Sequence, residues 1–134
     1  GVVLYALGWA CWKTYLGRPE ENWARMDAMT GLGNGLSAAG HHEDALSVGG
    51  AQLSMMRRFG GSRNNILIAQ SNLANSYRML GRFEEAMSVR RDVYSGWLEL
   101  HGEQHPATLR AATNYANIFN IMQRHAETKE LLRK

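Results

Sequence analysis

Two stretches of the sequence, NLANSYRMLGRFEEA at 72–86 and NYANIFNIMQRHAET at 114–128, are near copies of each other placed 42 residues apart. Asparagines, small residues and an Arg with a Glu three positions later recur in the same order in both. A fixed period of this size is the signature of a repeat architecture, in which each copy forms one supersecondary unit. The period therefore decides how every other motif in the chain is interpreted.

An earlier copy lies 41 residues before the middle one. The matched pairs are Leu32 with Leu73, Asn34 with Asn75, Gly40 with Gly81, Glu43 with Glu84, and Ala45 with Ala86. Still earlier, Trp12 stands five residues before Gly17, as Trp97 stands five before Gly102. The apolar N-terminal run is therefore interpreted as the second half of a repeat whose first half is missing.

Within each copy the apolar residues follow a helical period. In the middle copy they recur every three or four positions, at Ile66, Ala69, Leu73, Ala74, Tyr77 and Leu80. Gly81 can adopt the left-handed conformation that ends a helix. A second helix is predicted from near Phe83 to His101-Gly102, and Pro106 suits the first turn of the next helix. Each unit is therefore a helix, a short glycine turn, a helix and a short polar loop.

The sequence predicts an all-α fold, an α-solenoid of stacked antiparallel helix pairs with about seven helices. Neither helix of a pair can bury its apolar face alone, so neighbouring pairs must cover each other. Ala74 and Ala116 are predicted to lie where the helices of a pair pack closely. We expect one repeat array over residues 1–134, divided into the second helix of an incomplete repeat at 1–16 and helix pairs at 17–59, 60–101 and 102–134.

Composition excludes several classes of protein. The 134 residues are 45% apolar and 20% charged, and the formal charge of +3 is scattered, with no basic stripe of the kind that binds nucleic acid. The apolar run from Val2 to Trp12 is shorter than the roughly 20 residues that cross a bilayer, so no membrane contact is expected. Cys11 is the single cysteine, which fits a reducing, cytoplasmic setting. Because the chain starts at Gly1, we expect a piece of a longer protein.

The sequence does not predict an enzyme, a metal site or a cofactor. The five histidines do not combine with Cys, Asp or Glu at the spacing of a metal site, and Cys11 has no defined His and Asn partners. The segment GLGNG at 31–35 resembles a phosphate-binding loop only superficially, because no strand precedes it and no Lys-Ser/Thr follows. Its glycines are better explained as substituted positions of the repeat.

The middle copy, N-L-A-x-x-Y-x-x-L-G-R-F-E-E-A at 72–86, resembles the tetratricopeptide repeat. The period of 41–42 residues is similar to the extended kinesin-light-chain type, as is the connector LHGEQHPATL at 100–109. The resemblance covers roughly residues 17–134. The first copy departs from it at Gly31, Gly33 and His42, and the last copy at Gln123, His125 and Thr128. The resemblance implies a right-handed superhelix whose first helices line a concave groove for a peptide or a helix of a partner protein.

The candidate peptide-binding residues are the polar, non-core positions of those first helices. They are Asn34, Asn72, Asn75, Arg78, Arg110, Asn114, Asn117 and Asn120. An asparagine amide offers both a donor and an acceptor to a peptide backbone, and arginines add a preference for acidic ligands. In the kinesin-light-chain family, asparagines at matching positions contact cargo peptides. The alternative is that these asparagines bond to the neighbouring repeat and only stiffen the stack.

Two functions remain open at this point. In the first, the chain is an adaptor whose groove captures a peptide of a partner protein. In the second, it is a structural or regulatory array of a larger signalling protein, for example one that carries an NTPase domain, and has no peptide ligand of its own. The apolar ends of a truncated array would also allow the chain to associate with itself.

Overall fold

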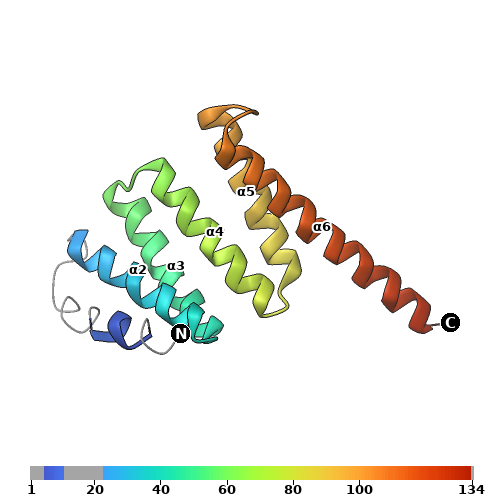
Figure 1. Cartoon of the computed structure of the whole chain (residues 1–134), viewed down its shortest axis with the longest axis horizontal. Coiled ribbons are helices and arrows are strands. Elements are labelled where there is room, and N and C mark those ends of the chain that lie inside the picture. The colour runs from blue at the N-terminus through green and yellow to red at the C-terminus, as the bar shows by residue number, and fades with distance from the viewer. Residues whose placement is uncertain (1–4, 11–22, 134) are drawn as a thin grey trace.

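The computed structural model describes residues 5–10 and 23–133, and this part of the chain contains helices and no strands. Residues 5–10 are helical. The other elements, in chain order, are α2 (Trp23–Ala38), α3 (His42–Phe59), α4 (Arg63–Met79), α5 (Phe83–His101) and α6 (Pro106–Arg133). The helices lie one after another in a row, and α6 extends beyond the rest of the molecule (Figure 1).

Each helix packs chiefly against its neighbours in the chain: α2 on α3, α3 on α4, α4 on α5, and α5 on α6. This pattern is that of a solenoid, in which each unit contacts only the next. The predicted all-α solenoid is confirmed. The helices of the described residues are six when residues 5–10 are included, close to the seven expected.

Two glycine turns repeat the same geometry 41 residues apart. Gly40 and Gly81 have φ values of 83° and 76°, in the left-handed region where a side chain would be strained. The residue after each glycine donates its N–H back into the helix, His41 to the Leu36 carbonyl and Arg82 to the Tyr77 carbonyl, both at 2.8 Å. These bonds satisfy carbonyl groups that the helix end leaves free, so the predicted glycine turns are confirmed.

The core follows the predicted apolar series. One cluster between α4, α5 and α6 contains Leu67, Val93, Trp97 and Ala111. A second cluster joins α2, α3 and α4 and contains Met26, Met29, Leu53, Met55, Met56, Ala69 and Leu73. The buried Thr108 hydroxyl donates to the Trp97 carbonyl at 3.1 Å, which fixes the start of α6 against the end of α5.

The last helix pair is not formed as predicted. A helix pair was expected over residues 102–134, but α6 continues through Gln123, the equivalent of Gly81, as one helix of 28 residues to Arg133. The physical reason is local: glutamine is a good helix former and has no easy access to the left-handed conformation. The segment that would have been the second helix therefore extends the first.

This change leaves one face of α6 uncovered. Ala74 of α4 is fully buried where α5 folds back on that helix, as predicted, whereas the equivalent Ala116 is exposed. The prediction that Ala116 lies at a close helix contact was wrong, because no second helix follows it within the described residues.

At the other end, residues 5–10 pack on α2. A Cβ atom added to Gly8 would lie 2.7 Å from Leu32 Cα, so the two backbones approach closely there. Tyr5 stacks on His41 with ring centroids 5.0 Å apart. Cys11 and Trp12, used in the sequence argument, lie outside the described residues. None of the helices in the described ranges combines the length and apolar character needed to cross a membrane.

Candidate functional site

The polar positions of the first helices form one surface, which we call the asparagine surface. Its members are Asn34 on α2, Asn72 and Asn75 on α4, and Asn114, Asn117 and Asn120 on α6. Two hollows lie along this surface, one between α2 and α4 and one between α4 and α6. Asn75 lines both of them, so the hollows adjoin.

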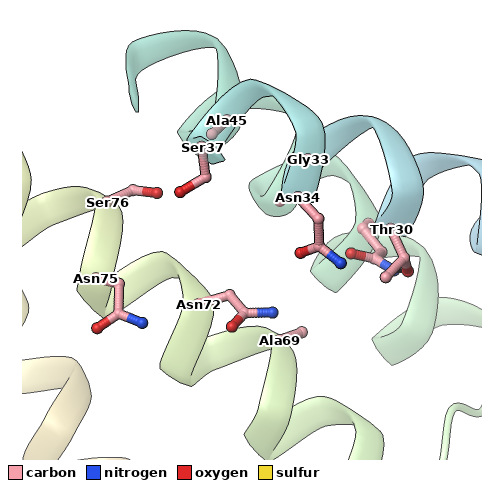
Figure 2. A pocket seen from close by; sticks show the side chains of 11 residues that line it. Thr30, Gly33, Asn34, Ser37, Ala45, Ala69, Asn72, Asn75 and Ser76 are labelled. Carbon is pink, nitrogen blue, oxygen red and sulfur yellow. Dashed lines mark hydrogen bonds between the residues drawn. The ribbon is translucent and has the colours of Figure 1, made fainter. Parts of the chain in front are cut away.

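The α2/α4 hollow is small, about 70 Å³, and its lining is neutral. Figure 2 shows Asn34 on α2, and Asn72 and Asn75 on α4, lining the same opening. Gly33, Ala45 and other small residues line the rest. A hollow of this size accepts a few atoms, such as a peptide group, and not a large side chain.

A buried polar pair lies beside this hollow. Gln52 of α3 is 8% exposed, and its Nε2 donates to the Thr30 hydroxyl oxygen and to the Met26 carbonyl, the latter at 3.4 Å. The Thr30 hydroxyl in turn donates to the Met26 carbonyl at 3.2 Å. Because these groups satisfy one another, they hold α2 and α3 together and leave the asparagines free to face a ligand.

The α4/α6 hollow is larger and positively charged. Its volume is about 450 Å³, and its lining contains three arginines and no Asp or Glu. Arg78 comes from α4, Arg90 from α5 and Arg124 from α6, and four asparagines lie among them. An opening of this size and charge suits a negatively charged side chain.

Arg90 is the unusual residue of this hollow. It is 7% exposed, and its Nη2 donates to Asn75 Oδ1 at 2.7 Å. Its buried Nε has no hydrogen-bond partner in the structure. Burial, and secondarily the charge of Arg78, lower the pKa of Arg90 below its ordinary value. Among the residues that the structure describes, no carboxylate balances this buried cation.

The structure brings most of the predicted site residues together. Asn34, Asn72 and Asn75 line the α2/α4 hollow, and Asn75, Arg78, Asn114, Asn117 and Asn120 line the α4/α6 hollow. Arg110 is exposed near the start of α6 and lines neither hollow. Whether these residues bind a ligand stays a prediction.

Sequence reasoning missed Arg90, Arg124, Thr30 and Gln52. The signal for Arg90 was present in the repeat itself: the positions equivalent to it are Gly49 in the first copy and Leu132 in the last. Because α3 folds with glycine at the equivalent position, the helix pair does not require an arginine there. Departures from the repeat were therefore as informative as the repeat.

Two of the five histidines, His101 and His105, stack on each other across the connector between α5 and α6. The rings of His101 and His105 lie 4.2 Å apart, next to Trp97. His105 Nδ1 accepts from the Ala107 N–H at 3.1 Å, so this side chain caps α6. In the ranges that the structure describes, no three His, Cys, Asp or Glu side chains gather in a group that could hold a metal.

Comparison with known proteins agrees with this architecture. The family model of the tetratricopeptide repeat matches residues 65–134. Among curated proteins, no sequence matches the chain. A crystal structure of nearly identical TPR-like repeats, assigned to a kinesin light chain of Podosopora anserina, superimposes with a TM-score of 0.79 at 19% identity, covering 97% of this chain and 62% of that one.

A second crystal structure, of a single-substitution variant of the same Podosopora anserina protein, superimposes with a TM-score of 0.69 at 20% identity. The match covers 86% of this chain and 55% of that one. The chain thus spans less than two thirds of these structures. At this level of identity the likeness concerns the fold.

Proposed function

Because the chain belongs to the tetratricopeptide repeat family, we propose that its asparagine surface binds an extended peptide or a helical segment of a partner protein. Repeats of this fold generally mediate protein–protein interactions. One observation carries the finer proposal: asparagines from three successive first helices lie along two adjoining hollows. An extended chain laid across the helices would meet one set of amides after another.

The chemistry of the amides supports this proposal. Each asparagine has a carbonyl oxygen that accepts and an NH₂ group that donates, which matches the N–H and C=O of a peptide group. Asn34, Asn72 and Asn117 are exposed, and none of their side chains makes a hydrogen bond with another described residue. Such residues are mediocre helix formers, so a mid-helix series of them is better explained by a ligand than by helix stability.

Asn75 also has a structural part, but within its own helix pair rather than toward the neighbouring repeat that the alternative interpretation named. Its carbonyl oxygen accepts from Arg90, so one lone-pair direction is already used within the fold. Replacing Asn75 would remove the hydrogen bond of a buried cation and would change stability as well as binding. Asn114 and Asn117 are therefore the better positions for a binding test.

The experiment selects peptides and then removes the amides. A pool of random dodecapeptides displayed on phage is enriched on the immobilised protein, and Kd is measured for the selected peptides. We expect the Asn114→Ala/Asn117→Ala double variant to weaken binding about tenfold or more, because each lost hydrogen bond is worth roughly 0.5–1.5 kcal/mol. The matched control is Asn64→Ala, an exposed asparagine of α4 that lines neither hollow.

The melting temperature distinguishes the two interpretations of the asparagines. Unchanged melting with weaker binding supports the ligand role. A large fall in melting temperature in the double variant would assign these residues to the stack. Failure to enrich any peptide would favour the other candidate, a structural array within a larger signalling protein.

The rest of the proposal concerns the setting of the module. We place it in a cytoplasmic, reducing compartment, which the single cysteine supports. Its proposed role is that of a scaffold without catalytic activity or cofactor of its own. The scattered charge of +3 supports a protein partner over nucleic acid.

A further inference from the structure

We propose that the α4/α6 hollow binds a phosphoryl group, carried by a phosphoserine or phosphothreonine of the peptide that lies on the asparagine surface. This inference rests on the proposed function and adds the chemistry of one subsite. The groups that would hold the phosphoryl oxygens are the guanidinium groups of Arg78, Arg90 and Arg124, with the nearby asparagine amides as further donors.

The first argument is the state of Arg90. Its side chain is buried, and within the described ranges its Nε has no partner and its Nη2 donates to a neutral amide, that of Asn75. A buried charge without a counter-charge is costly, and a fold retains one where an anion completes the site. The hollow in which Arg90 lies is open to solvent through the exposed Arg78 and Arg124, so an anion can reach it.

The second argument is that two arginines elsewhere in the array are paired with carboxylates. Arg63 lies 2.9 Å from a Glu99 oxygen, and Arg82 lies 3.2 Å from a Glu43 oxygen. Arg78 and Arg124 have no carboxylate partner among the residues that the structure describes. Together with Arg90, three arginines without a counter-charge thus gather in a single hollow whose lining has no acid.

The third argument comes from the register of the repeat. Arg124 is the equivalent of Arg82, and Glu84 is the equivalent of Glu43, so the repeat predicts an Arg124–Glu84 ion pair. That pair is absent from the described part of the chain, whereas Arg82 and Glu43 are paired. Because α6 continues straight past Gln123, Arg124 instead lines the α4/α6 hollow.

The fourth argument is that the fold does not need these charges. In the first copy the positions of Arg78 and Arg90 hold Ser37 and Gly49, and α2 and α3 form the same helix pair without either charge. The pair is therefore particular to the middle of the array. Charged residues that depart from the repeat and line the same hollow are better explained by ligand binding than by a structural role.

The number of charges favours a phosphoryl group over a carboxylate. A carboxylate brings one negative charge and two oxygens, whereas a phosphorylated side chain brings about −1.5 to −2 and three acceptor oxygens at pH 7. Three guanidinium groups from three helices can each donate to a different oxygen. The volume of about 450 Å³ leaves room for the side chain and its neighbours as well.

The test compares three degenerate peptide pools by fluorescence polarisation on the whole chain. Their central residue is phosphoserine or phosphothreonine, unmodified Ser or Thr, or Glu. We expect the phosphorylated pool to bind at least about tenfold more tightly than either other pool. Arg124→Gln, at an exposed position outside the predicted peptide-binding set, should remove most of that preference and leave binding of the unmodified pool unchanged. Arg78→Gln should also remove most of that preference. Arg91→Gln, an exposed arginine of α5 outside the hollow, is the matched control.

The outcomes separate this inference from the proposed function. Equal binding of the phosphorylated and unmodified pools, both dependent on Asn117, would overturn the phosphoryl site and leave the peptide surface in place. Equal binding of the Glu pool would show a general acidic subsite and would also overturn it, as would a preference that Arg78→Gln leaves intact. No binding of any pool would overturn both proposals.

Discussion

Helices α4 and α6 are equivalent copies of the repeat, but some of their equivalent positions differ sharply in burial. Leu67 of α4 is 4% exposed, while its equivalent Leu109 in α6 is 51% exposed. Ala74 is fully buried, while its equivalent Ala116 is exposed. At these two positions, the same residue type is in the core or on the surface according to whether a second helix folds back over it.

The difference between the two helices begins at one turn position. Gly81 ends the α4 segment in the left-handed conformation and lets α5 return along it. Gln123 continues the α6 helix instead, so Leu131 and Leu132 are 71% and 82% exposed at its end. Four pairs of substitutions test the cause of this difference. Each pair changes corresponding places in or next to α4 and α6.

The largest effect is expected for the leucines. Leu67→Ala opens a cavity in the cluster with Val93 and Trp97 and should lower the free energy of unfolding by about 2–5 kcal/mol. Leu109→Ala removes a half-exposed side chain and should change it by roughly 0.5 kcal/mol. Urea denaturation of both variants measures the two values. Equal losses would show that α6 is covered in solution.

The next largest difference in stability is expected when Ala74 and Ala116 are each replaced by a larger side chain. Ala74→Leu overpacks the contact between α4 and α5 and should cost about 1–3 kcal/mol. Ala116→Leu places a larger side chain on an open surface and should cost close to nothing. Thermal unfolding followed by circular dichroism compares them. A stable Ala74→Leu variant would contradict the close packing seen here.

Exchanging the turn residues tests the cause of the asymmetry. Gly81→Gln forces a side chain into a backbone with φ of 76° and should cost about 1–2 kcal/mol. Gln123→Gly weakens a continuous helix by about 1 kcal/mol, locally. Hydrogen exchange should then show faster exchange confined to the C-terminal part of α6 for Gln123→Gly, and through α4 and α5 for Gly81→Gln. The reverse distribution would refute this account of the turn.

The smallest effects concern the helix caps. Ser62 Oγ accepts from the Asn65 N–H at 3.2 Å and caps α4, while His105 Nδ1 caps α6. Ser62→Ala and His105→Ala should each cost about 1 kcal/mol in thermal unfolding. His105→Asn is the control, because its side-chain oxygen can still accept. If His105→Asn is as destabilised as His105→Ala, the stacking on His101 matters more than the cap.

The repeat made the fold largely predictable, because the glycine turns, the helix starts at Phe83 and Pro106 and the apolar faces all depend on local periodicity. The same periodicity led to the incorrect prediction of a helix pair over residues 102–134, where α6 continues through Gln123. A repeat implies a turn at each equivalent position, whereas a helix ends only where the residue itself permits it. The residues around Gln123 follow the repeat, but glutamine at that position favours a continued helix over a turn.

The candidate site was predictable only in part. The asparagines were found because they recur, so their equivalent placement on successive helices follows from the repeat. Arg90 lies on a second helix, outside the face that sequence reasoning considered, and its burial beside Asn75 depends on how α5 packs on α4. Arg110 was included by its position in a first helix, but it lies too near the start of α6 to reach either hollow.

The chain-neighbour packing of α2 to α6 also has a kinetic consequence. Almost every helix contact joins segments close in sequence, so little loop entropy is lost before a contact forms, and folding should be fast. A substitution that disrupts the α4–α5 interface would divide the array into two short helical stacks. Each stack would have too few helix–helix interfaces to stay folded. The packing of α4 on α5, beside the three arginines, therefore also connects the helices that precede it to those that follow it.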